Sequence, residues 1–209
     1  MALFDTVVLS AAYFPPVEYF FAIAQSGRVL IEQNELYQKQ SYRNRCRIYS
    51  GGGVMQLSIP VVKEVVHARP IRDIRIDYSE PWLRQHVRAI EAAYNSSPFY
   101  LYYKDDIIEV LDRRPEFLFD LDLALTEKLL ELVGIRAGIS FTESFQTDCG
   151  PGDFRSRIQP KYHGVSLLDE YGFNREYYQI FSSRFGFCAN LSILDLLCHE
   201  GPGAISYLL

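Results

Sequence analysis

Residues 6–32 alternate between strand and helix patterns, and this constrains the fold more than any other feature of the chain. Residues 6–10 (TVVLS) form a short apolar run rich in β-branched residues, which is typical of a buried strand. Two prolines then precede a predicted helix over residues 17–25, and residues 29–32 form a second apolar run. A helix between two buried strands usually joins parallel neighbours. We therefore expect a βαβ unit and an α/β fold whose sheet starts parallel.

A β-hairpin is predicted next. Residues 39–49 and 54–61 alternate between apolar and polar side chains, and SGGG at 50–53 separates them. Residues 71–78 (IRDIRIDY) are a further strand candidate. The hairpin adds antiparallel strands, so we expect a mixed sheet.

Helical spacing dominates the second half of the chain. Three helices are predicted: one capped by Ser79 and ending near residues 96–98, one over 105–113, and one over 115–133 that Gly134 closes. Residues 138–145 are expected to form one more strand, whereas 146–170 show no clear period. We expect several helices to cover the sheet.

Length and composition favour one α/β domain spanning residues 1–209. The net charge is −5, which disfavours a nucleic-acid-binding surface. The start of the chain lacks a signal peptide pattern, and no apolar run is long enough to cross a membrane, so we expect a cytoplasmic protein with no membrane partner. Four separated cysteines and four histidines show no metal-ligand spacing, and we predict no metal site.

Four cations share one parity in the first arm of the predicted hairpin. If residues 39–49 are a strand, Lys39, Arg43, Arg45 and Arg47 project from one face, while Asn44 lies on the other. Lys39, Arg43 and Arg45 are then candidates for binding a phosphate, pyrophosphate or carboxylate. The alternative is a solvated face whose cations pair with carboxylates of neighbouring strands, such as Glu35.

Tyr13 and His86 are two further candidates. Tyr13 belongs to the aromatic-proline turn after the first strand, where α/β folds often bind ligands, although two prolines also simply start a helix. His86 shares an apolar helix stripe with Trp82 and Ile90. A half-buried histidine of this kind serves either as a general base or as a core residue. Among the other histidines, only His163, beside Lys161, merits mutation, and His67 lies in a polar connection.

The C-terminal third has two patterns with a structural interpretation. Ser192 and Asp195 have the spacing of a helix capping box. Five aromatic residues form a stripe that indicates either packing or a homodimer surface: Tyr177, Tyr178, Phe181, Phe185 and Phe187.

Several stretches carry a family resemblance: AYFPPVEYF at 12–20, YQKQSYRNRCRI at 37–48, LSIPV at 57–61, IRDIRIDY at 71–78, residues 82–100, FLFDLDLALTEKLLELVGI at 117–135 and residues 187–208. Through them the chain resembles the WbqC-like protein family, in the form common in Bacteroidetes-type bacteria. The resemblance implies a link to surface-polysaccharide genes and, for some members, an aminoacyl or acyl transferase activity on sugars.

Together, residues and resemblance lead us to expect a cytosolic transferase acting on an anionic small molecule of sugar or surface-polysaccharide metabolism. Tyr13, Lys39, Arg43 and Arg45 are its predicted binding residues and His86 its predicted acid–base residue. No cofactor is indicated. The alternatives are a non-catalytic interaction or scaffold protein and a nucleotide-binding module resembling nucleotidylyltransferases.

Overall fold

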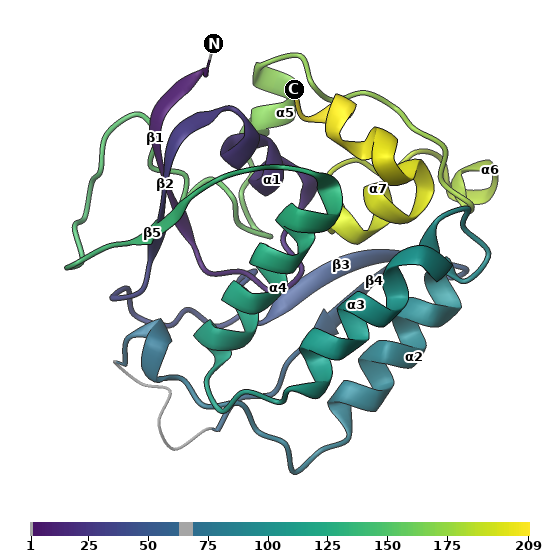
Figure 1. Ribbon diagram of the computed structural model, residues 1–209, viewed down its shortest axis with the longest axis horizontal. Coiled ribbons are helices and arrows are strands. Elements are labelled where there is room, and N and C mark those ends of the chain that lie inside the picture. The colour runs from purple at the N-terminus through teal and green to yellow at the C-terminus, as the bar shows by residue number, and fades with distance from the viewer. Residues whose placement is uncertain (1, 63–68) are drawn as a thin grey trace.

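The computed structural model of the chain describes residues 2–62 and 69–209, and Figure 1 shows how its elements are arranged. Strand β1 (Phe4–Ser10), helix α1 (Val17–Ala24) and strand β2 (Ser26–Glu32) follow one another, and β1 pairs with β2 in parallel. Strand β5 (Ile139–Phe141) pairs in parallel with the other edge of β2. The predicted βαβ unit is confirmed, and β2 is the central strand of a three-stranded parallel sheet.

Helix α1 is enclosed on all sides. It contacts β1 and β2 on one side and the C-terminal helices α5 (Leu167–Glu170) and α7 (Ile193–Glu200) on another. Every residue from Val17 to Ile23 is buried, which explains why the apolar residues surround the helix and do not form one stripe; Glu18 is the charged exception.

Strands β3 (Arg45–Ser50) and β4 (Gly53–Ser58) form the predicted hairpin. Gly53, at a φ of +99°, takes a backbone conformation that suits glycine at the turn. The hairpin pairs only with itself among the described strands, so the parallel and antiparallel strands form two sheets.

The strand predicted over 39–49 is wrong in its first half, because β3 begins only at Arg45. The preceding residues turn instead, with Gln40 at a φ of +62°. The carbonyl of Tyr42 accepts a hydrogen bond from the Tyr13 amide at 2.8 Å, and that of Asn44 accepts one from the Ile59 amide at 2.8 Å. Lys39 and Arg43 therefore lie outside the strand, and the four cations do not share one sheet face.

Three long helices cover the hairpin side of the molecule (Figure 1): α2 (Trp82–Tyr94), α3 (Tyr100–Asp112) and α4 (Leu118–Val133). Helix α2 packs against β3 and α3, and α3 packs against α4. Gly134 ends α4 in the left-handed conformation, at a φ of +87°, as predicted.

Three local predictions differ from the structure. Residues 71–78 do not form a strand: a 3₁₀ turn, η2 (Ile71–Asp73), is followed by isolated bridges, because the buried Ile71 and Ile74 are spaced by three. Helix α2 follows Pro81 and has no side-chain cap, so Ser79 does not cap it. Strand β5 spans only three residues of 138–145. His67 lies outside the described residues.

The C-terminal part adds a short helix α6 (Ser182–Phe185) and a closing 3₁₀ helix η3 (Gly201–Tyr207). Buried apolar side chains from both sheets and the long helices form a continuous core. The fold class is confirmed: an α/β fold with a parallel βαβ unit, a β-hairpin and several covering helices. Within the described residues, none of the helices combines the length and apolarity that a membrane span requires.

Candidate functional site

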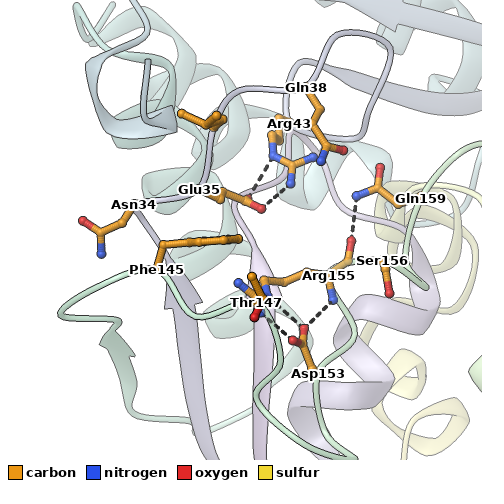
Figure 2. Close-up of a pocket in the computed structure, with 11 residues that line it drawn as sticks. Asn34, Glu35, Gln38, Arg43, Phe145, Thr147, Asp153, Arg155, Ser156 and Gln159 are labelled. Atoms are coloured by element: carbon orange, nitrogen blue, oxygen red, sulfur yellow. Dashed lines mark hydrogen bonds and ion pairs between the residues drawn. The ribbon is translucent and has the colours of Figure 1, made fainter. Parts of the chain in front are cut away.

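A cavity of about 680 Å³ opens where β1 and β2 end. The segment that follows β2 forms one wall and the loop that follows β5 forms the other. We call this space the arginine cavity. Its lining residues are Asn34, Glu35, Leu36, Gln38, Arg43, Phe145, Thr147, Asp153, Arg155, Ser156 and Gln159. Figure 2 shows Arg43 with Glu35 and Arg155 with Asp153 on different sides of the cavity. The carboxyl ends of parallel strands are the usual ligand position in α/β folds.

The loop after β5 is fastened to β1. The Val8 amide donates to the Gly152 carbonyl at 2.9 Å, and the Phe154 amide donates to the Val8 carbonyl at 3.0 Å. A Cβ atom on Gly152 would lie 1.9 Å from the Thr6 carbonyl oxygen, so only glycine permits this approach. The loop thereby carries Asp153 and Arg155 to the cavity wall.

Arg43 is a buried cation in this wall, with 1% of its side chain exposed. Its Nε donates to Glu35 Oε1 at 2.9 Å, and its Nη2 donates to the second Glu35 oxygen and to Ser10 Oγ, the latter at 2.9 Å. Nη1 has no hydrogen-bond partner among the described residues. Because buried donors are nearly always paired, this nitrogen is an unsatisfied donor in the residue that lines the cavity.

Arg155 joins the loop to the parallel sheet. Its Nη1 lies 3.2 Å from Glu32 Oε2 at the end of β2, and its Nε donates to Asp153 Oδ1 at 2.8 Å. Its Nη2 donates to the Gln146 carbonyl at 2.7 Å. Burial raises the pKa of Asp153, but the hydrogen bonds from Arg155 outweigh it and hold that pKa below its ordinary value. All three guanidinium nitrogens of Arg155 thus have protein partners, whereas Nη1 of Arg43 has none among the described residues.

A second cavity of about 300 Å³ adjoins the first and shares Gln38, Ser156 and Gln159 with it. We call it the lysine cavity. Its other lining residues are Lys39, Gln40, Ser41, Pro160, Lys161, Tyr162 and His163. Lys161 Nζ lies 2.5 Å from Gln40 Oε1, which joins the two segments that form it.

Tyr13 and His86 meet in the core, away from both cavities. The Tyr13 hydroxyl lies 2.9 Å from His86 Nδ1, and both residues are buried. Burial lowers the pKa of His86 from 6.5 to about 4, although a hydrogen bond with the Ser58 backbone opposes this change. At neutral pH the ring is uncharged and accepts the Tyr13 hydrogen through Nδ1. The catalytic role of His86 stays a prediction.

Asp122, on α4, is the most unusual carboxyl group in the core. It is fully buried, and neither of its oxygens has a hydrogen-bond partner among the described residues. Burial raises its pKa well above the ordinary value, and the charge of Arg43 opposes this only in part. Burial therefore favours the neutral form of Asp122, because a neutral carboxyl avoids the cost of a buried charge.

The structure separates the predicted binding residues. It places Arg43 in the wall of the arginine cavity and Lys39 in the wall of the lysine cavity, whereas Arg45 and Tyr13 line neither. Asn44 is buried, and its side-chain amide donates to the Ile59 carbonyl at 2.8 Å. Roles in binding for these residues stay predictions.

Arg155, Asp153 and Gln159 are cavity residues that sequence reasoning missed. They lie in the segment without a clear period, where neither a helix nor a strand pattern indicates which side chains meet. The run CGPGD before Arg155 marks a tight loop, and that is the only signal it gives.

The C-terminal patterns have structural roles. Ser192 is the N-cap of α7, and its hydroxyl accepts from the Leu194 amide at 3.3 Å, as predicted. Asp195 does not complete a capping box: it is buried and accepts hydrogen bonds from the Tyr177 hydroxyl at 2.8 Å and from Gln179. In the aromatic stripe, Tyr178 and Phe185 are exposed, and pairing through them stays a prediction.

In the described part of the chain, no group of three or more histidine, cysteine, aspartate and glutamate side chains is placed to hold a metal ion. The donors that the arginine cavity offers are guanidinium, amide and hydroxyl groups, with an exposed aromatic ring at Phe145. Such groups suit an oxygen-rich organic ligand.

Fold and cavity together define an α/β protein with a cavity at the carboxyl ends of its parallel strands. Comparison with known proteins gives the family: the chain belongs to the WbqC-like protein family, whose model matches residues 11–159. The matched segment contains every lining residue of the arginine cavity, while Lys161 and His163 follow it.

One curated relative is the Mycobacterium tuberculosis protein named "Uncharacterized protein Rv1507c". It is 28% identical to the chain over 228 residues, which cover 96% of each protein. No solved structure matches the chain.

Proposed function

We propose that the chain is a transferase that binds an anionic, oxygen-rich small molecule of sugar or surface-polysaccharide metabolism in the arginine cavity. The observation that carries the binding part is the unpartnered Nη1 of Arg43. A buried donor without a partner costs about 1–3 kcal/mol, and more when it is charged, so a ligand oxygen that accepts from it gains this energy back. The transferase part is supported by the resemblance to WbqC-like proteins.

Hydrogen bonds also hold the Arg43 guanidinium in a fixed orientation in the cavity wall. Glu35 fixes two of the guanidinium nitrogens, which orients the third. Gln159 donates from Nε2 to the Arg155 carbonyl at 2.7 Å, which leaves its side-chain oxygen to accept from a ligand hydroxyl, and the Gln38 amide lines the same cavity.

Phe145 adds an apolar surface to these polar groups. Its side chain is 50% exposed and its ring faces the guanidinium of Arg155 at 5.2 Å from the ring centroid. An exposed ring beside convergent polar groups can pack against the flat apolar face of a sugar. This supports a ligand that carries a sugar.

A thermal-shift screen tests the binding part. Nucleotide sugars, sugar phosphates, acyl-CoAs and amino acids are added to the wild type, to Thr147→Trp and to Ser96→Trp. Thr147 is exposed and lines only the arginine cavity, so the indole fills the cavity at little cost in stability. Ser96 is exposed after α2 and lines neither cavity, which makes it the matched control.

We expect at least one compound to raise the melting temperature of the wild type and of Ser96→Trp but not of Thr147→Trp. A screen without any such compound contradicts the proposal. The transferase part is tested by incubating each binding compound with a second compound of the set and measuring group transfer by mass spectrometry. Binding without transfer in any pair contradicts the enzymatic part and favours a non-catalytic binding protein.

We also propose a cytoplasmic location. All four cysteines are free, with Cys46 and Cys198 buried, and reduced thiols are typical of the cytosol. Fractionation of the native host is the test, and recovery of the protein outside the cytosolic fraction contradicts this location.

A further inference from the structure

The two cavities differ in their charges. In the arginine cavity, Arg43 faces Glu35 and Arg155 faces Asp153, so each cation is matched by a carboxylate. The lysine cavity has no such match: two lysines and a histidine line it, and none of its lining residues is acidic. The charges that line the arginine cavity therefore balance, whereas the lining of the lysine cavity has a net positive charge.

The fold brings Lys39, Lys161 and His163 together from distant parts of the chain. Lys39 lies in the turn before β3, whereas Lys161 and His163 follow the loop that carries Arg155. Lys161 contacts Gln40, the neighbour of Lys39, so both ammonium groups belong to one rim. All three side chains are exposed, so a ligand can reach them from solvent.

An anion in the lysine cavity would interact with the two lysine charges without a competing carboxylate in the lining. Each exposed lysine contributes modestly, since water and salt screen the charge. A phosphate or diphosphate group gains the most binding energy from the lysines, because it carries about two or more negative charges and several acceptor oxygens. The shared wall, formed by Gln38, Ser156 and Gln159, lets one molecule extend from this cavity into the next.

We propose that the lysine cavity is the phosphate subsite of a phosphorylated sugar, whose sugar ring lies in the arginine cavity. The inference rests on the proposed function and adds the class of the substrate: a sugar phosphate or a nucleotide sugar. It also assigns roles to Lys39 and Lys161, which bind the phosphate oxygens.

Isothermal titration with inorganic pyrophosphate tests the subsite. The proteins are the wild type, Lys39→Gln/Lys161→Gln and, as the control, Arg84→Gln/Arg88→Gln. Both double variants remove two exposed positive charges, but Arg84 and Arg88 lie on α2, which lines neither cavity.

We expect pyrophosphate affinity to fall about tenfold or more in the lysine variant and to change little in the arginine control. Raising the salt concentration should weaken wild-type binding more than the residual binding of the lysine variant. Equal affinities in the wild type and the lysine variant, or equal losses in both variants, overturn the proposal. Glucose 1-phosphate against glucose then tests the link between the cavities: the phosphate ester should bind more tightly to the wild type, and this preference should vanish in the lysine variant.

The result separates this inference from the proposed function. If Thr147→Trp abolishes binding of a screened compound but pyrophosphate affinity does not depend on the lysines, the phosphate subsite is wrong. The proposed ligand site in the arginine cavity is then still supported. If pyrophosphate affinity depends on the lysines but no compound loses binding in Thr147→Trp, the proposed function is wrong. The lysine cavity is then an isolated anion site.

Discussion

The pH dependence of folding stability distinguishes the two roles considered for His86, a buried core residue or a catalytic residue. In the folded chain its pKa is lowered to about 4 by burial, and in the unfolded chain it returns to about 6.5. Between these values the unfolded state binds a proton that the folded state does not. Stability is therefore lost as the pH falls from 6.5 through 4 and is fully present above 6.5.

The size of this loss follows from the two pKa values. Each pH unit between them changes the free energy of unfolding by about 1.4 kcal/mol, so the full window corresponds to about 3 kcal/mol. His86→Gln removes the titrating group but keeps an acceptor for the Tyr13 hydroxyl and a donor for the Ser58 backbone. We expect the difference in stability between the wild type and this variant to shift by about 3 kcal/mol in the variant's favour from pH 7.5 to pH 4.

Urea unfolding followed by tryptophan fluorescence measures the effect. Trp82 is the single tryptophan, it is buried, and its ring centroid lies 5.1 Å from that of His86. His163→Gln is the control, because His163 is exposed. If His86→Gln follows the wild-type curve at every pH, the core assignment is refuted and His86 titrates as an accessible catalytic group would.

Two further predictions concern buried charges. Arg43→Met should lower the free energy of unfolding by about 3–5 kcal/mol because it leaves Glu35 buried without its partner, whereas Arg75→Met, which breaks the exposed pair with Glu116, should cost less than about 1 kcal/mol. Similar urea midpoints for both variants would contradict the buried pair. Asp122→Asn should gain stability relative to the wild type as the pH rises above about 4, since the folded state holds a proton that the unfolded carboxyl group releases. A stability difference that is constant with pH would show that Asp122 is ionised in the fold.

Local patterns were enough to predict the elements whose packing is local. The βαβ unit follows from two β-branched runs around an apolar helix, and Gly134 ends α4 because the helix closes there in a left-handed conformation. Such features depend on neighbours within a few residues, and sequence spacing records them directly.

The site depends on contacts that spacing does not record. Because Arg43 and Arg45 are two residues apart, a strand pattern predicts them on one face. In the structure, hydrogen bonds from the Tyr13 and Ile59 amides accompany a turn before β3, and Arg43 is buried against Glu35. Arg155 reaches the cavity only because Gly152 lets its loop run against β1. The contacts of the Arg155 loop with β1 and β2 join segments more than a hundred residues apart. The pairing of Arg43 with Glu35 follows no strand or helix period, so the tertiary structure was needed to find both.

The central claim is that a ligand binds where β1 and β2 end, with an oxygen on Arg43 Nη1. A crystal structure with the tightest-binding compound of the screen tests it most directly. We predict ligand density in the arginine cavity within hydrogen-bond distance of Arg43 Nη1, with its phosphate beside Lys39 and Lys161. Density beside His86, on the exposed ring of Tyr178, or anywhere else outside the two cavities would contradict the claim.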